Sequence, residues 1–173
     1  MKNKGIAKFE KISFKQFKKD VCNDRETYES IKLPERSTSG SAGYDFYSPY
    51  DYCIKTGESA KIPTGIRCKI KDGWVLTLHV RSSIGFKYHT ILSNVTGIID
   101  SDYYDSNNEG HIFIKLVNHG DETLSINKGD RIVQGVFLPY GITKDDNVLK
   151  TRNGGFGSTG EWKIKGVYKN EST

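Results

Sequence analysis

The sequence predicts an all-β domain built as a jelly roll or a β-barrel-like fold. Eighteen glycines are spread through the 173 residues and stand between short apolar runs, which favours turns and strands over long helices. Within residues 74–80, alternation places Trp74, Leu76, Leu78 and Val80 on one face of a strand. Short strands in series with turns between them are typical of sandwiches, jelly rolls and barrels.

The expected strands follow one another from residue 42 onward. Residues with a high preference for strands occupy seven segments: 44–47, 59–62, 65–70, 74–80, 90–95, 111–118 and 131–139. Turn-forming groups separate them at residues 56–57, 71–73, 119–121 and 127–130. This arrangement predicts one β domain.

A short helix is expected before this domain. Ser13 and Gln16 have the spacing of a capping box, in which both side chains satisfy free backbone donors at a helix start. The apolar residues that follow recur at helical spacing: Phe14, Phe17 and Val21. These features predict an amphipathic helix from Ser13 to about Asn23.

The chain is expected to have three parts. Residues 1–32 form an N-terminal extension with the short helix, and residues 33–148 form the β domain. Residues 149–173 are polar and glycine-rich, which predicts a flexible C-terminal arm.

Composition excludes several classes of protein. Three cysteines without metal-ligand spacing indicate reduced thiols and a cytoplasmic location. No apolar stretch approaches the roughly 20 residues that span a bilayer, so no membrane partner is expected. The net charge of +5 suits an anionic ligand. The basic cluster Lys15, Lys18 and Lys19 lacks the interleaved aromatic residues of a nucleic-acid surface, so no nucleic-acid partner is expected.

Five segments have residues that could bind or transform a ligand. They are, in order, residues 42–45, 81–85, 94–103, 129–135 and 152–160. Taken singly, each has a plain structural interpretation as a turn, a hairpin, a surface ion pair or a low-complexity tail. In the fourth segment, for example, Asp130 and Arg131 could pair near the surface.

Three of the segments have a specific chemical potential. Residues 81–85 combine an arginine, two hydroxyls and a glycine turn that can hold a phosphate. Residues 94–103 suit a hairpin whose backbone reads a flat base, with Asp100 at its mouth. The glycines of residues 152–160 allow backbone amides to approach a polyphosphate, although the segment is not a Walker loop.

In this order and at roughly this spacing, the five segments resemble the motifs of the trimeric dUTP pyrophosphatase (dUTPase) family. The resemblance implies a jelly-roll subunit in a homotrimer whose active sites are shared between subunits. It also implies hydrolysis of dUTP to dUMP and pyrophosphate by water attack on the α-phosphorus, with Mg²⁺ as cofactor. The C-terminal arm would close over a neighbouring site as a lid.

The resemblance implies a role for individual residues. Asp100 matches the carboxylate that positions and activates the water, and Tyr103 matches the aromatic ring that rejects a 2′-hydroxyl. Asp45 matches an acidic residue that holds the water shell of Mg²⁺. The residues expected at uracil are Asn94, Gly97, Ile98 and Ile99, with Phe156 as the covering ring. The residues expected at the phosphates are Arg81, Ser82, Ser83, Gly85, Gln134, Arg152, Gly157, Ser158 and Thr159.

The chain departs from the family pattern at three places. Residues 104–110 form a longer loop than the family's short turn, and the fifth motif has one residue fewer after Arg152. Residues 161–173 continue past the usual end of the family.

Two other functions are compatible with parts of this pattern. A dCTP deaminase shares the fold but requires a glutamate and a differently arranged third motif. A non-catalytic scaffold that binds a regulatory protein would use the N-terminal extension and the tail, and intact motifs argue against it as the only role.

Overall fold

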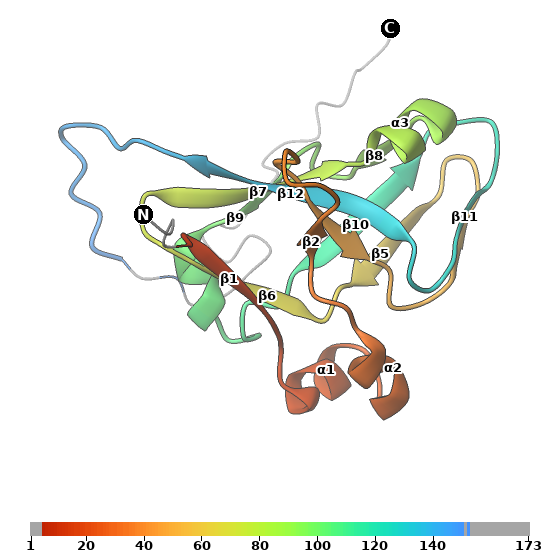
Figure 1. Ribbon diagram of the computed structural model, residues 1–173, viewed down its shortest axis with the longest axis horizontal. Coiled ribbons are helices and arrows are strands. Elements are labelled where there is room, and N and C mark those ends of the chain that lie inside the picture. Colours follow the sequence, from red (N-terminus) through yellow and green to blue (C-terminus); the bar gives the residue numbers. More distant parts are fainter. Residues whose placement is uncertain (1–4, 151, 153–173) are drawn as a thin grey trace, which may run out of the picture.

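The computed structural model describes residues 5–150 and residue 152, and these residues form mainly short antiparallel strands (Figure 1). The strands are β1 (Ala7–Lys11), β2 (Glu35–Arg36), β3 (Tyr44–Tyr47), β4 (Tyr52–Ile54), β5 (Ser59–Pro63), β6 (Ile66–Ile70), β7 (Trp74–Val80), β8 (Thr90–Leu92), β9 (Gly97–Ile99), β10 (Phe113–Asn118), β11 (Leu124–Ile126) and β12 (Arg131–Pro139). The helices are α1 (Phe14–Asp20), α2 (Arg25–Ser30), α3 (Ser82–Tyr88) and the 3-10 helix η1 (Ser101–Asp105). The expectation of an all-β, jelly-roll-like subunit is confirmed.

The described strands form four antiparallel sheets that enclose one core. The largest sheet has the order β2-β3-β12-β7-β9, and a second has the order β5-β10-β8. Two-stranded sheets pair β1 with β6 and β11 with β4. Leu76 and Val133 of the largest sheet are buried in the same apolar cluster as Ile114 and Leu116 of the second. Burial of these side chains is the main favourable term in folding the domain.

Strong sequence patterns predict the long strands correctly. Strands β3, β7 and β12 have the expected bounds. The expected strand 90–95 ends at Leu92, because Val95 lies in a turn with a φ of 62°. Strands β1, β2, β4 and β11 were not expected. The pairing partners of β1, β4 and β11 are distant in the sequence, and β2 has only two residues, so no local pattern marks these strands.

Helix α1 begins where the capping box predicts, but only half of the box forms. The hydroxyl of Ser13 accepts a hydrogen bond from the Gln16 amide at 3.1 Å. The Ser13 amide donates to the carboxylate of Glu109 at 2.7 Å, while the Gln16 side chain donates to Asp20 at 2.8 Å. Helix α2 was not expected, and Asp24 caps it by accepting from the Thr27 amide at 2.9 Å. At the start of α1, Glu109, which is 96 positions from Ser13, thus takes the role predicted for Gln16.

Residues before position 33 pack closely on the β domain. Strand β1 pairs with β6 from Ala7 opposite Ile70 to Lys11 opposite Ile66. The side chain of Phe17, on α1, is completely buried in the common core.

Residues 81–85 were expected as a turn, and the structure shows the start of helix α3 instead. Arg81 occupies the N-cap position with extended backbone angles, and the Gly85 amide donates to the Arg81 carbonyl at 2.9 Å. The helix ends at His89, which adopts a left-handed conformation. Within the described residues, α3 and the other helices are all too short to cross a membrane.

Candidate active site

A pocket of about 240 Å³ lies beside strand β9. Its lining includes six of the residues singled out from the sequence: Asn94, Gly97, Ile98, Ile99, Tyr103 and Arg152. Strand β9 pairs with β7 and is the edge strand of the largest described sheet. An edge strand presents backbone donors and acceptors that can bind a ligand. This pocket therefore suits a flat ligand with hydrogen-bonding groups along one side.

Strand β9 begins with a glycine that lies close to β7. Gly97 lies opposite Leu78 of β7, and a Cβ atom at Gly97 would lie 3.0 Å from the Leu78 Cβ. A side chain at this position would require Leu78 to shift by a few tenths of an ångström, so glycine allows β7 and β9 to approach closely beside the pocket.

Asp100 directly follows β9 and lies at the N-terminus of η1. Its side chain is 44% exposed and forms an ion pair with the guanidinium of Arg152. The same guanidinium donates from Nε to Oδ1 of Asp102 at 3.0 Å and lies 5.9 Å from the centre of the Tyr103 ring. Arg152 thus reaches the carboxylate expected to act as the base, whereas the sequence predicted a contact with phosphate.

Tyr103 forms an inner wall of the pocket. Only 7% of the residue is exposed, and its hydroxyl donates to the carbonyl of His111 at 2.7 Å. Asn108 donates to the same hydroxyl at 2.9 Å. Burial raises the pKa of Tyr103, so the hydroxyl stays protonated. The two hydrogen bonds at this hydroxyl restrict the position of the ring.

A second group of predicted residues lines a different cavity, of about 370 Å³: Asp45, Arg81, Ser82 and Gln134. Asp45 and Gln134 face each other in the register of β3 and β12. The buried carboxylate of Asp45 pairs with Arg81 Nε at 3.0 Å and with Arg131 Nη1 at 3.3 Å, and accepts from the Ser37 hydroxyl at 2.8 Å. The arginine cluster around Asp45 suits an anion.

Arg131 does not pair with Asp130, its neighbour in the sequence. Its guanidinium contacts Asp45 and the Ser37 hydroxyl. Asp130 instead accepts hydrogen bonds from the backbone amide and side chain of Asn127 at 2.8 and 3.2 Å. The sequence did not reveal Arg131 as part of the anion cluster, because its partner lies 86 positions away.

The two groups of residues lie on either side of β7. Gly97 is opposite Leu78 on one side, and Gln134 is opposite His79 on the other. Ser83 lines a further cavity of about 340 Å³ together with Arg81 and Arg131. Phe156, Gly157, Ser158 and Thr159 lie outside the described residues. One chain therefore presents the pocket beside β9 and the Asp45 cluster as separate cavities.

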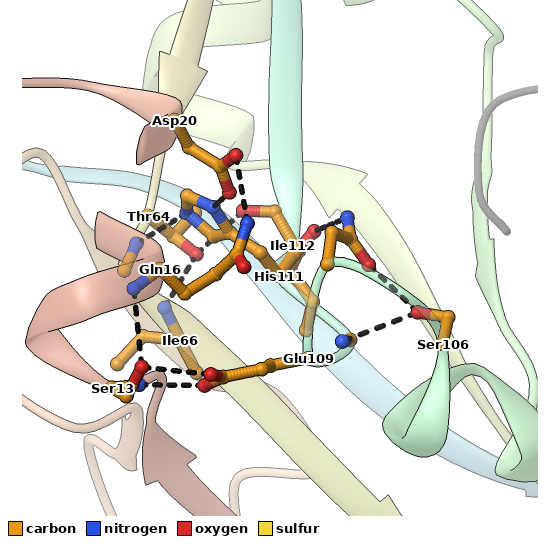
Figure 2. A network of polar contacts seen from close by, with 12 residues as sticks. Ser13, Gln16, Asp20, Thr64, Ile66, Ser106, Glu109, His111 and Ile112 are labelled. Atoms are coloured by element: carbon orange, nitrogen blue, oxygen red, sulfur yellow. Dashed lines mark hydrogen bonds and ion pairs between the residues drawn. The ribbon is translucent and has the colours of Figure 1, made fainter. Parts of the chain in front are cut away.

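His111 is a further residue that sequence reasoning missed. It is completely buried, with Nδ1 2.7 Å from Asp20 Oδ2 and Nε2 accepting from the Gly65 amide at 3.0 Å (Figure 2). This arrangement places the single proton of a neutral ring on Nδ1, because Nε2 is the acceptor. Burial lowers the pKa of His111, although Asp20 opposes the shift.

The buried His111 predicts a loss of stability in mild acid. In the unfolded chain the ring takes up a proton near its ordinary pKa of 6.5, whereas the folded protein resists protonation until a lower pH. The free energy of unfolding should be undiminished above pH 6.5 and fall as the pH drops below it. Urea titrations at about pH 7.5 and about pH 5.5 measure the difference.

The variant H111Q should be less stable at neutral pH but should lose less stability between these two pH values. The matched variant H119Q replaces an exposed histidine and should keep the wild-type dependence. Glu10 does not interfere, because hydrogen bonds from Lys8 and Tyr104 lower its pKa to about 2, so its contribution is lost only in stronger acid. Equal pH dependence in H111Q and the wild type would contradict the assignment.

The pocket beside β9 and the arginine cluster suit two parts of one kind of ligand. The edge strand offers hydrogen bonds to a flat ring, and the cations offer binding to phosphate. These features are those expected of the class of nucleotide-binding proteins, and Asp100, which pairs with Arg152 of the pocket lining, adds a candidate catalytic group.

Comparison with known proteins identifies the family. The dUTPase family model matches residues 29–160. The chain is 45% identical over 133 residues to the deoxyuridine 5'-triphosphate nucleotidohydrolase of Lactococcus lactis, covering 75% of this chain and 89% of that protein. It is 37% identical over 140 residues to the enzyme of the same name from Fowlpox virus, covering 76% and 92% of the two chains. This chain belongs to the dUTPase family, as its five motifs predicted.

Solved structures agree with this result. The dUTPase of Streptococcus mutans is 37% identical and superposes with a TM-score of 0.63, covering 79% of this chain and 98% of that one. The dUTPase of phage phi11 of S. aureus shares the fold at 23% identity, with a TM-score of 0.63 and coverage of 84% and 97%. A mutant of that phage protein is described with a coordinated structural Mg(II) ion.

Proposed function

We propose that this enzyme hydrolyses dUTP to dUMP and pyrophosphate by attack of a water on the α-phosphorus, with Asp100 positioning and deprotonating the water. The observation that supports the proposal is the position of the Asp100 carboxylate, partly exposed at the end of β9 and beside the pocket. A general base must reach both the solvent and the bound substrate. The carboxylate of Asp100 is open to solvent, whereas that of Asp45 is buried and held by two arginines.

The base and the sugar would bind beside β9. Backbone groups of Gly97, Ile98 and Ile99 lie on the edge strand and can hydrogen-bond to uracil, with Asn94 at the rim of the same pocket. The Tyr103 ring would pack against deoxyribose. Since its hydroxyl is held by two hydrogen bonds, the ring cannot turn aside to admit a 2′-hydroxyl.

The role of Tyr103 predicts a change in sugar selection. Replacing Tyr103 by alanine should lower the ratio of kcat/KM for dUTP to that for UTP by about 10- to 100-fold, because removal of the ring opens space for the 2′-hydroxyl. Replacement by phenylalanine keeps the ring and should lower this ratio less than Y103A does. The measurement is pyrophosphate release from each nucleotide. A preserved ratio in Y103A would place sugar selection elsewhere.

The phosphates would bind the cluster around Arg81. Ser82, Ser83 and Gln134 offer donors beside the Arg81 guanidinium. The Gly85 amide donates to the Arg81 carbonyl within the helix, so this residue would act by leaving space beside the phosphates, since it has no side chain. We assign Arg152, Phe156, Gly157, Ser158 and Thr159 of the arm to closure over the bound nucleotide.

We further propose that three chains assemble and share their sites. Within one chain, the pocket beside β9 and the Asp45 cluster are separate cavities on either side of β7. A homotrimer in which the pocket of one chain meets the phosphate cluster of its neighbour would complete each site. Phe86 and Ile91 are large exposed apolar side chains that association could cover. Sedimentation equilibrium would show the mass of a monomer if the proposal is wrong.

The donor set near the phosphates fits Mg²⁺ held mainly by the substrate. In the described residues, no three His, Cys, Asp or Glu side chains converge to form a cage. A carboxylate has about four acceptor positions, and Asp45 uses three of them for Arg81, Arg131 and Ser37. The remaining position can accept a water of the Mg²⁺ shell, which is the role that the resemblance to the family implies for Asp45. The bound ion would reduce the negative charge of the phosphates during attack.

One assay separates this function from that of a dCTP deaminase. Incubation with dUTP should release pyrophosphate, and incubation with dCTP should release no ammonia. Ammonia from dCTP without pyrophosphate from dUTP would overturn the proposal.

The described cysteines are all free thiols, which supports a cytoplasmic enzyme.

A further inference from the structure

The long loop after the third motif folds back onto Tyr103. Asn108 donates to the Tyr103 hydroxyl at 2.9 Å, and the hydroxyl of Ser106 donates to the Tyr103 carbonyl at 2.7 Å. The Gly110 amide donates to Ser106 at 3.2 Å, which closes the loop on itself. The loop therefore contacts Tyr103 at both its hydroxyl and its backbone carbonyl.

The same loop is anchored to the N-terminal segment. Glu109 adopts a left-handed conformation with a φ of 57°, which turns its side chain toward helix α1. Its two carboxylate oxygens accept from the Ser13 amide and the Ser13 hydroxyl, each at 2.7 Å (Figure 2). A charged acceptor at a helix N-terminus is favourable, because free backbone donors and the helix dipole both point toward it.

A second connection from α1 reaches Tyr103 through His111. Asp20, at the end of α1, contacts the His111 ring at 2.7 Å (Figure 2). The backbone carbonyl of His111 accepts the hydrogen bond from the Tyr103 hydroxyl at 2.7 Å. The Tyr103 hydroxyl is held by Asn108 and by the His111 carbonyl, and each of these groups is linked to one end of α1. Glu109, next to Asn108, contacts Ser13 at the start of the helix, and His111 contacts Asp20 at its end.

We propose that α1 and the loop 104–110 form one positioning unit that holds the Tyr103 ring and thereby sharpens the preference for deoxyribose over ribose. The inference rests on the proposed role of Tyr103 in sugar selection. Asn108, Glu109 and Asp20 are positioning residues in this unit, because they act through the tyrosine. Ser13 and Asp20 lie before residue 29, where the family match begins, whereas the loop 104–110 lies within the matched residues.

The physical reason is the small difference in space that sugar selection requires. A 2′-hydroxyl adds one oxygen atom, so a shift of the ring by a fraction of an ångström admits it. Two hydrogen bonds to one hydroxyl restrict such a shift more than ring packing alone. A displacement of this size would change the relative use of dUTP and UTP more than the overall turnover of dUTP.

The test compares full-length variants by their ratio of kcat/KM for dUTP to that for UTP. N108A and E109Q should each lower this ratio by about 3- to 10-fold, with a smaller change in kcat for dUTP. The matched control E122Q replaces an exposed glutamate in another loop and should leave the ratio unchanged. N108S provides a milder change should N108A fail to fold.

A double-mutant cycle shows whether Asn108 acts through the tyrosine hydroxyl. Removal of the hydroxyl in Y103F should lower the ratio about as much as N108A does, and N108A added to Y103F should have no further effect. Additive effects would show that Asn108 acts by another route and would overturn the proposal. For Asp20, D20N keeps an acceptor for His111 and should retain more of the ratio than D20A.

The outcomes separate this inference from the proposed function. A lower thermal midpoint for N108A and E109Q with an unchanged ratio would show a purely structural role and overturn the positioning unit. If Y103A changes the ratio while these variants do not, sugar selection by Tyr103 stands and the inference fails. If Y103A leaves the ratio unchanged, the proposed function of Tyr103 itself fails.

Discussion

Replacement of Asp100 by asparagine is expected to lower kcat for dUTP by about 100- to 10,000-fold while the protein stays folded. This loss corresponds to about 2.7–5.4 kcal/mol of barrier. Asparagine has nearly the same shape as aspartate but cannot take a proton from the attacking water. The side chain is 44% exposed and lies outside the apolar core, so the fold does not depend on its charge. Pyrophosphate release at saturating dUTP measures the effect.

The neighbouring Asp102 provides the matched control. It lies two residues away and contacts the same Arg152 guanidinium, at 3.0 Å from Nε. D102N therefore removes a carboxylate charge and weakens an arginine contact without removing the proposed base, and it should retain most of the activity. If D102N and D100N lose equal activity, the effect comes from the Arg152 contacts and not from proton transfer. Unchanged hydrolysis in D100N would end the catalytic assignment.

Removal of all residues after Lys150 is the second change with a large expected effect. The truncated enzyme should fold, assemble and bind dUTP, and its kcat should fall by about 100-fold or more because the arm's donors to the transition state are lost. Residues 140–150 are exposed, and the apolar core extends along β12 only as far as Phe137. Steady-state kinetics, calorimetric binding and sedimentation together measure these properties.

A shorter truncation distinguishes the motif from the tail. An enzyme that ends at Gly160 retains Arg152 and the glycine-rich segment and lacks only residues 161–173. We expect it to keep the kcat of the full-length enzyme. If the enzyme that ends at Lys150 turns over as fast as the full chain, the arm does not act as a lid.

Local patterns in the sequence predicted much of the domain. The alternation in residues 74–80 and the flanking turns predicted β7 with its observed bounds, and β3 and β12 were equally clear. Ser13 marked the start of α1, because a helix cap is a local feature of a few residues. The order of five motifs identified the family, and six of the predicted residues do line one pocket.

Contacts between distant residues could not be predicted in the same way. Gln16 has the right spacing for the capping box, yet Glu109 takes its place because the loop 104–110 brings a charged acceptor to Ser13. Asp130 was a plausible partner for Arg131, yet the pairing of β3 with β12 brings Asp45 to it. In both cases the observed partner is distant in the sequence and is brought close only by the tertiary fold.

The sequence by itself determined the β class of the domain, the start of its first helix and the family to which the chain belongs. These properties depend on residue order and on periodicities of two to four residues, which can be read along the chain. Only the tertiary structure decided that the N-terminal segment joins the core, that residues 81–85 begin a helix and that the predicted site residues divide between cavities on either side of β7. These properties depend on strand pairing and burial between residues far apart in the sequence, for which a single chain has no local pattern.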